Sequence, residues 1–139
     1  MTGVDRMDEF AKHPVFDASL LDELAALGQP GEPDIRVRLF KLYRESLGKS
    51  LTALEDAVRR GDTQAAGRVA HGMKSATQNV GGTRLSKRFA FVEEVARSDR
   101  LAEAIEQLAM IREDARQLLA VLDRQVAQLA GSSRGAKDG

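Results

Sequence analysis

Helix-breaking prolines are confined to the first quarter of the chain, and no other feature constrains the fold as strongly. The prolines are Pro14, Pro30 and Pro33, so from Asp34 to the C-terminus only glycines interrupt a sequence that can form helix. Ala, Leu, Arg, Glu and Gln, which all favour helices, dominate this stretch, and aromatic residues make up only 4% of the chain. The sequence therefore predicts an all-α protein.

Capping residues and glycines divide the chain into segments of helical length. Each long segment has apolar residues at three-four spacing, which places a hydrophobic stripe along one face of the helix. The predicted helices cover residues 20–27, 34–60, 62–80, 84–97 and 98–130. In the second of them the stripe runs through Ile35, Leu39 and Leu42 and shifts by one position near Leu47, so we expect a bend or two abutting helices there.

Particular residues are expected to begin and end these helices. Residues 17–19 can cap the first helix, and Gly28 would end it in a left-handed conformation. Gly61 is expected to end the long second helix, and Asp62 to cap the third. Thr83 can cap the fourth helix in the same way.

Four long amphipathic helices with short connections are expected to form an antiparallel, up-down four-helix bundle, with the short N-terminal helix covering one end. A length of 139 residues suits one domain with a single core. We expect residues 1–16 to be a polar lead-in, residues 17–130 to form the bundle, and residues 131–139 to be a flexible tail.

Composition narrows the function classes. Lys and Arg together number 21, as do Asp and Glu, and this balance argues against a general nucleic-acid binder. Without cysteine, and with His13 far from His71 in sequence, the chain offers no zinc site, and we expect it to bind no metal or cofactor. It lacks a membrane-spanning apolar run and a signal peptide, so we expect a cytoplasmic protein that does not bind membranes. We also expect it to be a monomer and to bind no nucleic acid.

The helix predicted over residues 62–80 carries a candidate reactive group, His71. At 100° per residue the apolar side chains fall in one sector, and His71 points to the opposite side. The apolar sector contains Ala65, Ala66, Val69, Met73, Ala76 and Val80. The face around His71 contains Gln64, Gly67, Arg68, Lys74, Ser75 and Gln78. His71 is therefore expected to be an exposed imidazole in polar surroundings.

Two features of this face suit a nucleophile that enters another protein's active site. Gly67 and Ser75, one turn before and after the imidazole, are small, although glycine in a helix interior costs about 1 kcal/mol relative to alanine. Arg68 and Lys74 flank the ring, and nearby positive charge would keep the imidazole neutral and nucleophilic at about pH 7. The same cations would neutralise a phosphoryl group on His71.

Several segments resemble the signature of histidine-containing phosphotransfer (HPt) domains. The matching segments are Ala70–Ser75, Asn79–Gly82, Leu85–Ser86, Val92–Glu93 and Ala96–Arg97, and weaker similarity extends the match to roughly residues 14–129. This resemblance implies a helical bundle that is phosphorylated on a histidine. It also implies exchange of the phosphoryl group with aspartates of response-regulator receiver domains, or with a hybrid sensor kinase.

The resemblance also implies roles for individual residues. His71 would be the phosphoacceptor, through Nε2, and Lys74 its charge partner. Ser75 would leave room for the receiver, and Gly81 with Gly82 would form the turn between two helices. Because the chain has no phosphate-binding loop, we do not expect it to phosphorylate itself from ATP; Mg²⁺ would be held by the receiver.

Other positions are predicted to contact the partner or depart from the family pattern. The predicted docking residues are Gln64, Gly67, Arg68, Ser75, Gln78 and Phe91. Phe91 stands where the family usually has a polar residue, and peripheral core is the other interpretation of it and of Val95. Arg88 stands where an apolar residue is usual. We expect no acid to orient the His71 ring, so Ser75 and His71 do not form a hydrolase-type pair.

Two further interpretations stay open from the sequence. The chain could be a helical docking or anti-activator module that binds a signalling partner through the same surface without phosphoryl transfer. It could also be one half of a coiled-coil dimer formed through its long last helix.

Overall fold

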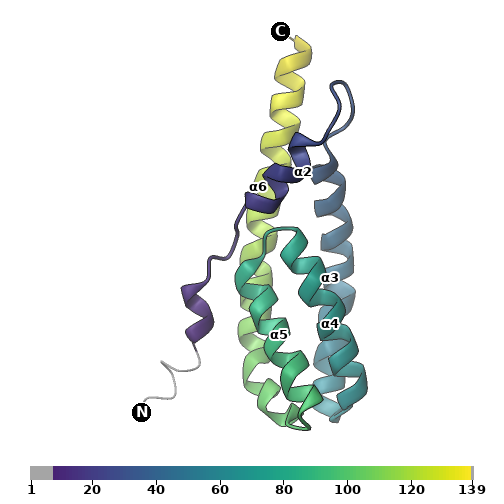
Figure 1. The fold of residues 1–139 in the computed structure, drawn as a ribbon, viewed down its shortest axis with the longest axis vertical. Coiled ribbons are helices and arrows are strands. Elements are labelled where there is room, and N and C mark those ends of the chain that lie inside the picture. The colour runs from purple at the N-terminus through teal and green to yellow at the C-terminus, as the bar shows by residue number, and fades with distance from the viewer. Residues whose placement is uncertain (1–7, 139) are drawn as a thin grey trace.

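The computed structural model describes the backbone of residues 8–138 and the side chains of residues 8–130. All regular secondary structure in this part of the chain is helical, which confirms the all-α class. In chain order the elements are the 3₁₀ helix η1 (Glu9–Lys12), α2 (Ser19–Ala26), α3 (Ile35–Arg60), α4 (Thr63–Asn79), α5 (Thr83–Arg97), the 3₁₀ helix η2 (Leu101–Gln107) and α6 (Leu108–Asp138) (Figure 1).

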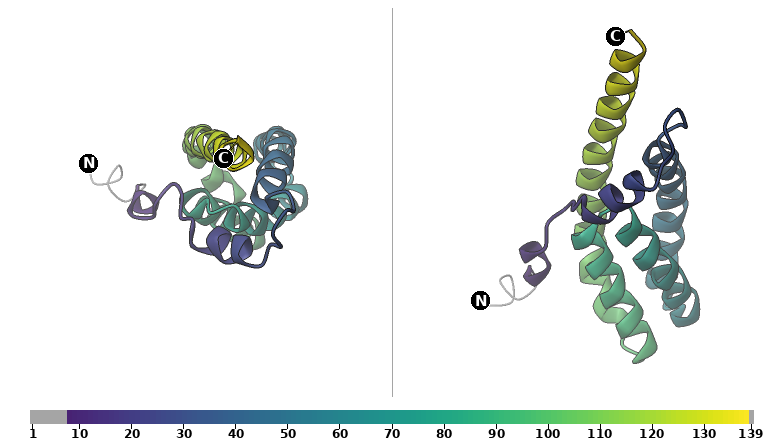
Figure 2. Two further views of the ribbon diagram at one scale, coloured as in Figure 1. Left: turned by 90° about the horizontal axis from the view of Figure 1, so that it is seen from above. Right: turned by 45° about the horizontal axis from the view of Figure 1, so that its top comes forward.

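The four long helices pack around one core. Around the bundle, α3 contacts α4, α4 contacts α5, α5 contacts α6, and α6 contacts α3. Helices α3 and α6 extend beyond α4 and α5 at one end of the molecule, where α2 lies across the bundle (Figures 1 and 2). Apolar side chains from α2 to α6, together with Leu101 and Ala104 of η2, form a single buried cluster. None of the described helices carries an apolar stretch of the kind that crosses a bilayer.

Helix α3 is continuous, so the prediction of two abutting helices was wrong. The buried stripe runs through Phe40, Tyr43 and Leu47, whereas Leu42, which we placed in the stripe, is 55% exposed. With Phe40 and Tyr43 in the stripe, the three-four spacing continues without a shift. The apparent break came from assigning the wrong apolar residues to the core.

Three of the predicted helix boundaries are confirmed. The Asp34 carboxylate accepts a hydrogen bond from the Arg36 backbone N–H and begins α3. Gly61 ends α3 with a φ of 70°, a left-handed conformation that glycine adopts without steric cost. Asp62 begins α4 by accepting from the backbone N–H of Ala65.

Other boundaries differ from the prediction. Helix α2 ends at Ala26, the following Leu27 has a right-handed conformation, and Gly28 is not left-handed. Thr83 is the first residue of α5 and does not cap it; Gly82 precedes it without a side-chain cap. The backbone of α6 stays helical through Asp138, past the end that we predicted at residue 130.

The segment before α2 lies against α5 and the α4–α5 turn. The Arg84 side chain donates hydrogen bonds to the backbone carbonyls of His13 and Ala11, at 2.8 and 3.1 Å. The backbone N–H of Asp17 donates to the carbonyl of Gly81 at 2.7 Å. Residues 8–17 are therefore attached to the bundle, whereas residues 1–7 lie outside the described part of the chain.

Candidate functional site

The imidazole of His71 stands outside the core, on the outer face of α4. Its side chain is 69% exposed. The fully buried residues of α4 are Ala66, Ala70, Met73 and Thr77, whereas Val69 is only partly buried. The buried sector is thus rotated slightly from the predicted one. This rotation brings Thr77 into the core, where its hydroxyl pairs with the Tyr43 hydroxyl at 2.7 Å.

Most of the predicted neighbours share the face of His71. Gln64, Arg68, Ser75 and Gln78 are exposed, and Gly67 and Lys74 are partly exposed. The face is therefore polar and open. Small residues contribute to this openness, because a Cβ atom at Gly72 would have no neighbour within 4 Å.

A glutamate orients the ring, so our expectation that no acid does so was wrong. Glu93 of α5 has a side chain that is 10% exposed, and its Oε2 lies 2.5 Å from Nδ1 of His71. Its Oε1 accepts a hydrogen bond from Nζ of Lys74 at 2.6 Å. The guanidinium of Arg97 lies 3.2 Å from Oε2. One carboxylate therefore joins the imidazole to two cations.

The charge of Glu93 decides which ring nitrogen is free. The hydrogen bond from Lys74 holds the pKa of the Glu93 carboxyl below its ordinary value. Partial burial raises this pKa, and the hydrogen bond from His71 lowers it further. An ionised carboxylate can only accept, so Nδ1 must carry the proton of this hydrogen bond. In the neutral imidazole, Nε2 then has the lone pair, and it points away from the Glu93 side of the ring.

Lys74 is held by Glu93. We predicted it as a charge partner for a phosphate on His71, and its ammonium is bound to the carboxylate next to the ring. The backbone at this position is also fixed, because the hydroxyl of the buried Ser86 donates to the Lys74 carbonyl at 2.8 Å. Helices α4 and α5 are thus connected through both side chain and backbone beside His71.

The α4–α5 turn is built from Gly81 and Gly82. Gly81 has a φ of 86°, and a Cβ atom there would collide with the carbonyl oxygen of Asp17. A Cβ atom at Gly82 would lie 2.6 Å from Leu118 and 2.7 Å from Thr77 side-chain atoms. Glycine is required at both positions, for the left-handed conformation at the first and for close packing at the second.

Phe91 is partly buried against this chain's own residues. Its ring meets that of Phe10 edge to face, with centroids 6.0 Å apart. The guanidinium of Arg88 lies 5.0 Å from the Phe10 centroid, while its side chain, 2% exposed, pairs with Asp114 and donates to Gln107. Arg88 can therefore occupy a core position because buried acceptors satisfy it.

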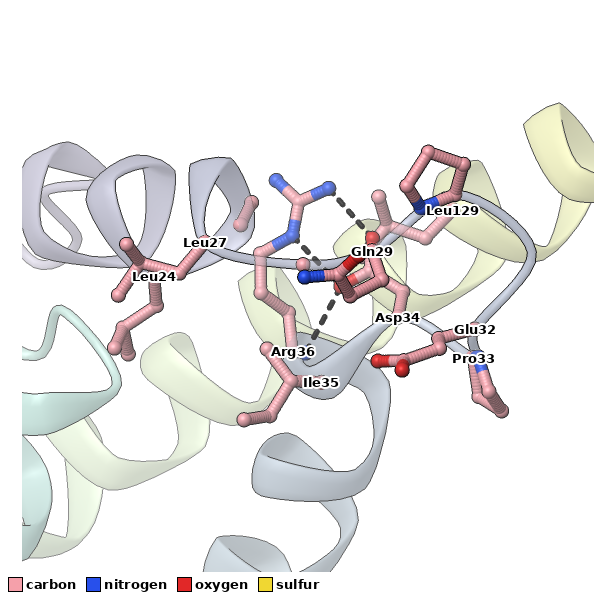
Figure 3. Close-up of a pocket in the computed structure, with 12 residues that line it drawn as sticks. Leu24, Leu27, Gln29, Glu32, Pro33, Asp34, Ile35, Arg36 and Leu129 are labelled. Carbon is pink, nitrogen blue, oxygen red and sulfur yellow. Dashed lines mark hydrogen bonds and ion pairs between the residues drawn. The ribbon is translucent and has the colours of Figure 1, made fainter.

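A hollow of the described surface lies away from this site. Its volume is about 770 Å³, and it lies between α2, the following loop and the start of α3 (Figure 3). Leu24, Leu27, Ile35 and Leu129 line it, beside the ion pair between Asp34 and Arg36. Among the residues that the structure describes, no three His, Asp or Glu side chains are grouped to hold a metal ion.

Comparison with known proteins finds one matching family model and a solved structure of similar fold. The family model described as "Hpt domain" matches residues 38–132. The crystal structure of histidine-containing phosphotransfer protein B (HptB) from Pseudomonas aeruginosa PAO1 is similar in fold, with a TM-score of 0.72 and 23% sequence identity. The match covers 83% of this chain and 96% of that chain. No functionally curated protein matches the sequence at a significant level.

Proposed function

The chain belongs to the Hpt domain family, and we propose that it relays a phosphoryl group on His71 between aspartates of response-regulator receiver domains. A hybrid sensor kinase is the second kind of donor that fits this proposal. The observation that carries it is the exposed imidazole whose Nδ1 is bound to Glu93, because this hydrogen bond leaves Nε2 available to an incoming phosphoryl group.

The transfer step uses Nε2 as the nucleophile. The Nε2 lone pair attacks phosphorus in line, an Nε2–P bond forms, and the bond between phosphorus and the aspartyl oxygen breaks. The electron pair of that bond leaves with the receiver carboxylate. The imidazole gains positive charge while its proton stays on Nδ1, and the Glu93 carboxylate stabilises this charge. The reverse step delivers the group to a second receiver.

The receiver and this chain contribute different groups to the transfer. The receiver would hold Mg²⁺, which would neutralise charge on the phosphoryl oxygens. This chain supplies a rigid, correctly protonated imidazole, and Lys74 beside it can turn from Glu93 toward a bound phosphoryl group. The chain itself acts as a carrier and does not phosphorylate itself from ATP.

The proposal also covers the arrangement of the helices and the oligomeric state. Short connections between α3 and α4 and between α4 and α5 favour an antiparallel, up-down four-helix arrangement. The proposal also expects a cytoplasmic monomer, which a solution-mass measurement would check against a coiled-coil dimer.

The test is phosphoryl transfer from labelled receivers. Incubated with each phosphorylated receiver of the source organism, the wild-type chain should gain acid-labile, base-stable phosphate, and His71→Gln should gain none. Label retained by His71→Gln would reject the assignment. A docking module without phosphoryl transfer would bind a receiver, acquire no label and bind equally well as His71→Gln.

A further inference from the structure

A shallow hollow lies beside the imidazole, over Gly67. It has a volume of about 270 Å³ and is formed by the first turns of α4 and the last turns of α5. Arg68 and Arg97 stand at its sides, and Glu93, which binds His71, is part of its lining. A partner that reaches Nε2 of His71 therefore also comes close to this hollow.

Packing does not require glycine at position 67. A Cβ atom there would make only an ordinary contact of 3.5 Å with Cβ of Ala96, and the φ angle of Gly67 is not positive. Glycine is a poor residue for a helix interior. What the missing side chain does provide is open space above Ala96, next to the reactive ring.

The charges around this space favour an anion. Helix α4 contains Arg68 and Lys74 but no acidic residue, although the whole chain has zero net charge. Glu93 is the one acid that lines the hollow, and it is already bound by Lys74, His71 and Arg97. The Arg97 side chain is 73% exposed, so N–H donors that Glu93 does not use remain accessible.

We propose that the hollow over Gly67 receives a carboxylate side chain of the receiver domain, bound by Arg68 and Arg97. This inference rests on the proposed function, since it names a contact that the relay partner makes. Arginine binds carboxylates through two parallel hydrogen bonds, which gives the contact directional specificity. Arg68 and Arg97 therefore select receivers that carry an acidic residue at the edge of their own active site. The hollow does not hold the transferred phosphoryl group.

Arg68→Glu tests this selection, with Arg124→Glu as the matched control. Arg124 is also exposed and lies on α6, which packs chiefly against α3 and α5. Both variants change the net charge by the same amount. The receiver is one whose phosphorylated form transfers its phosphoryl group to the wild-type chain, and binding is measured with its unphosphorylated form. Its Kd should rise about tenfold for Arg68→Glu and less than twofold for Arg124→Glu. Equal values for the two variants would overturn the inference.

Compensation identifies the partner group. Acidic residues around the receiver's active site are changed to lysine one at a time, and one such change should restore binding to Arg68→Glu while weakening binding to the wild-type chain. If no receiver change restores binding, Arg68 acts through general attraction and the carboxylate contact is rejected. A wild-type chain that accepts phosphate from no receiver would instead contradict the proposed function itself.

Discussion

Nδ1 of His71 and Oε2 of Glu93 lie 2.5 Å apart, although the two residues are on different helices, 22 positions apart in sequence. The hydrogen bond fixes both the rotation of the ring and the position of its proton. Lys74 binds the second oxygen of the same carboxylate, so α4, which carries His71, is tied to α5 beside the imidazole. The imidazole of His71 is thus both exposed and held in one orientation.

Replacing Glu93 by glutamine should slow transfer without unfolding the protein. The amide is nearly the same size but lacks the charge that strengthens hydrogen bonds to His71 and Lys74. We expect about a tenfold lower kcat, which corresponds to about 1.4 kcal/mol, and a larger fraction of His71 protonated on Nε2. Imidazole ¹⁵N NMR measures the second effect. Unchanged tautomer populations in Glu93→Gln would show that Glu93 does not position the ring.

The same carboxylate should contribute to the acid stability of the fold. Its pKa is lowered in the folded chain, chiefly by the hydrogen bond from Lys74, so the contribution is fully present above the unfolded-state pKa of about 4.3. It is lost as the pH falls through the lower folded pKa. The free energy of unfolding of the wild type should therefore exceed that of Glu93→Gln at about pH 5. This difference should shrink below about pH 4.

Urea denaturation at a series of pH values measures this difference. Comparison with Glu93→Gln is essential, because the pKa values of Asp34 and Glu55 are also lowered, by hydrogen bonds from Arg36 and Arg112. Those contributions are common to both proteins and cancel. A difference that does not change with pH would contradict an ionised Glu93 in the folded state.

Alanine should have opposite effects on stability at two glycines. Gly67→Ala should stabilise the protein by about 0.5–1 kcal/mol, since alanine is the better helix former and its Cβ has room beside Ala96. Gly81→Ala should destabilise it by more than that, because φ is 86° and the methyl group would meet the carbonyl of Asp17. Thermal unfolding checks both changes. A lower melting temperature for Gly67→Ala would mean that the fold does need glycine there.

Removing one partner of the buried ion pair between Arg88 and Asp114 should be strongly destabilising. Arg88→Met would leave the Asp114 side chain, 6% exposed, without its cation, at a cost of about 3–5 kcal/mol. The double variant Arg88→Met, Asp114→Leu should recover most of that loss, because no buried charge remains. Urea unfolding of the single and double variants measures the coupling, and a double variant as unstable as Arg88→Met would contradict it.

The sequence predicted what depends on one helix at a time. Helical periodicity placed His71 on the outer face of α4, the last proline placed the start of α3 near Asp34, and capping chemistry located Gly61 and Asp62 at helix ends. The contact with Glu93 was missed because a helical projection contains no information about which residue of the next helix faces the ring. The resemblance to HPt domains already included Glu93 among its matching residues, and that was the available signal.

Burial in the core was harder to predict where polar atoms are involved. Arg88 was recognised as a departure from the family pattern, but its buried partners Asp114 and Gln107 lie on other elements and carry no sequence signal of their pairing. In α3 the choice between Leu42 and Tyr43 depended on Thr77, which offers Tyr43 a hydrogen-bonding partner inside the bundle. Such pairs become visible only when the helices are packed together.

The identity of the phosphorylated atom tests the central claim most directly. The ¹⁵N-labelled chain is phosphorylated by a receiver, and ¹⁵N–³¹P coupling locates the phosphoryl group. The account predicts a single coupling, to Nε2 of His71, with Nδ1 still protonated and bound to Glu93. Coupling to Nδ1, or phosphate on any other residue, would contradict it.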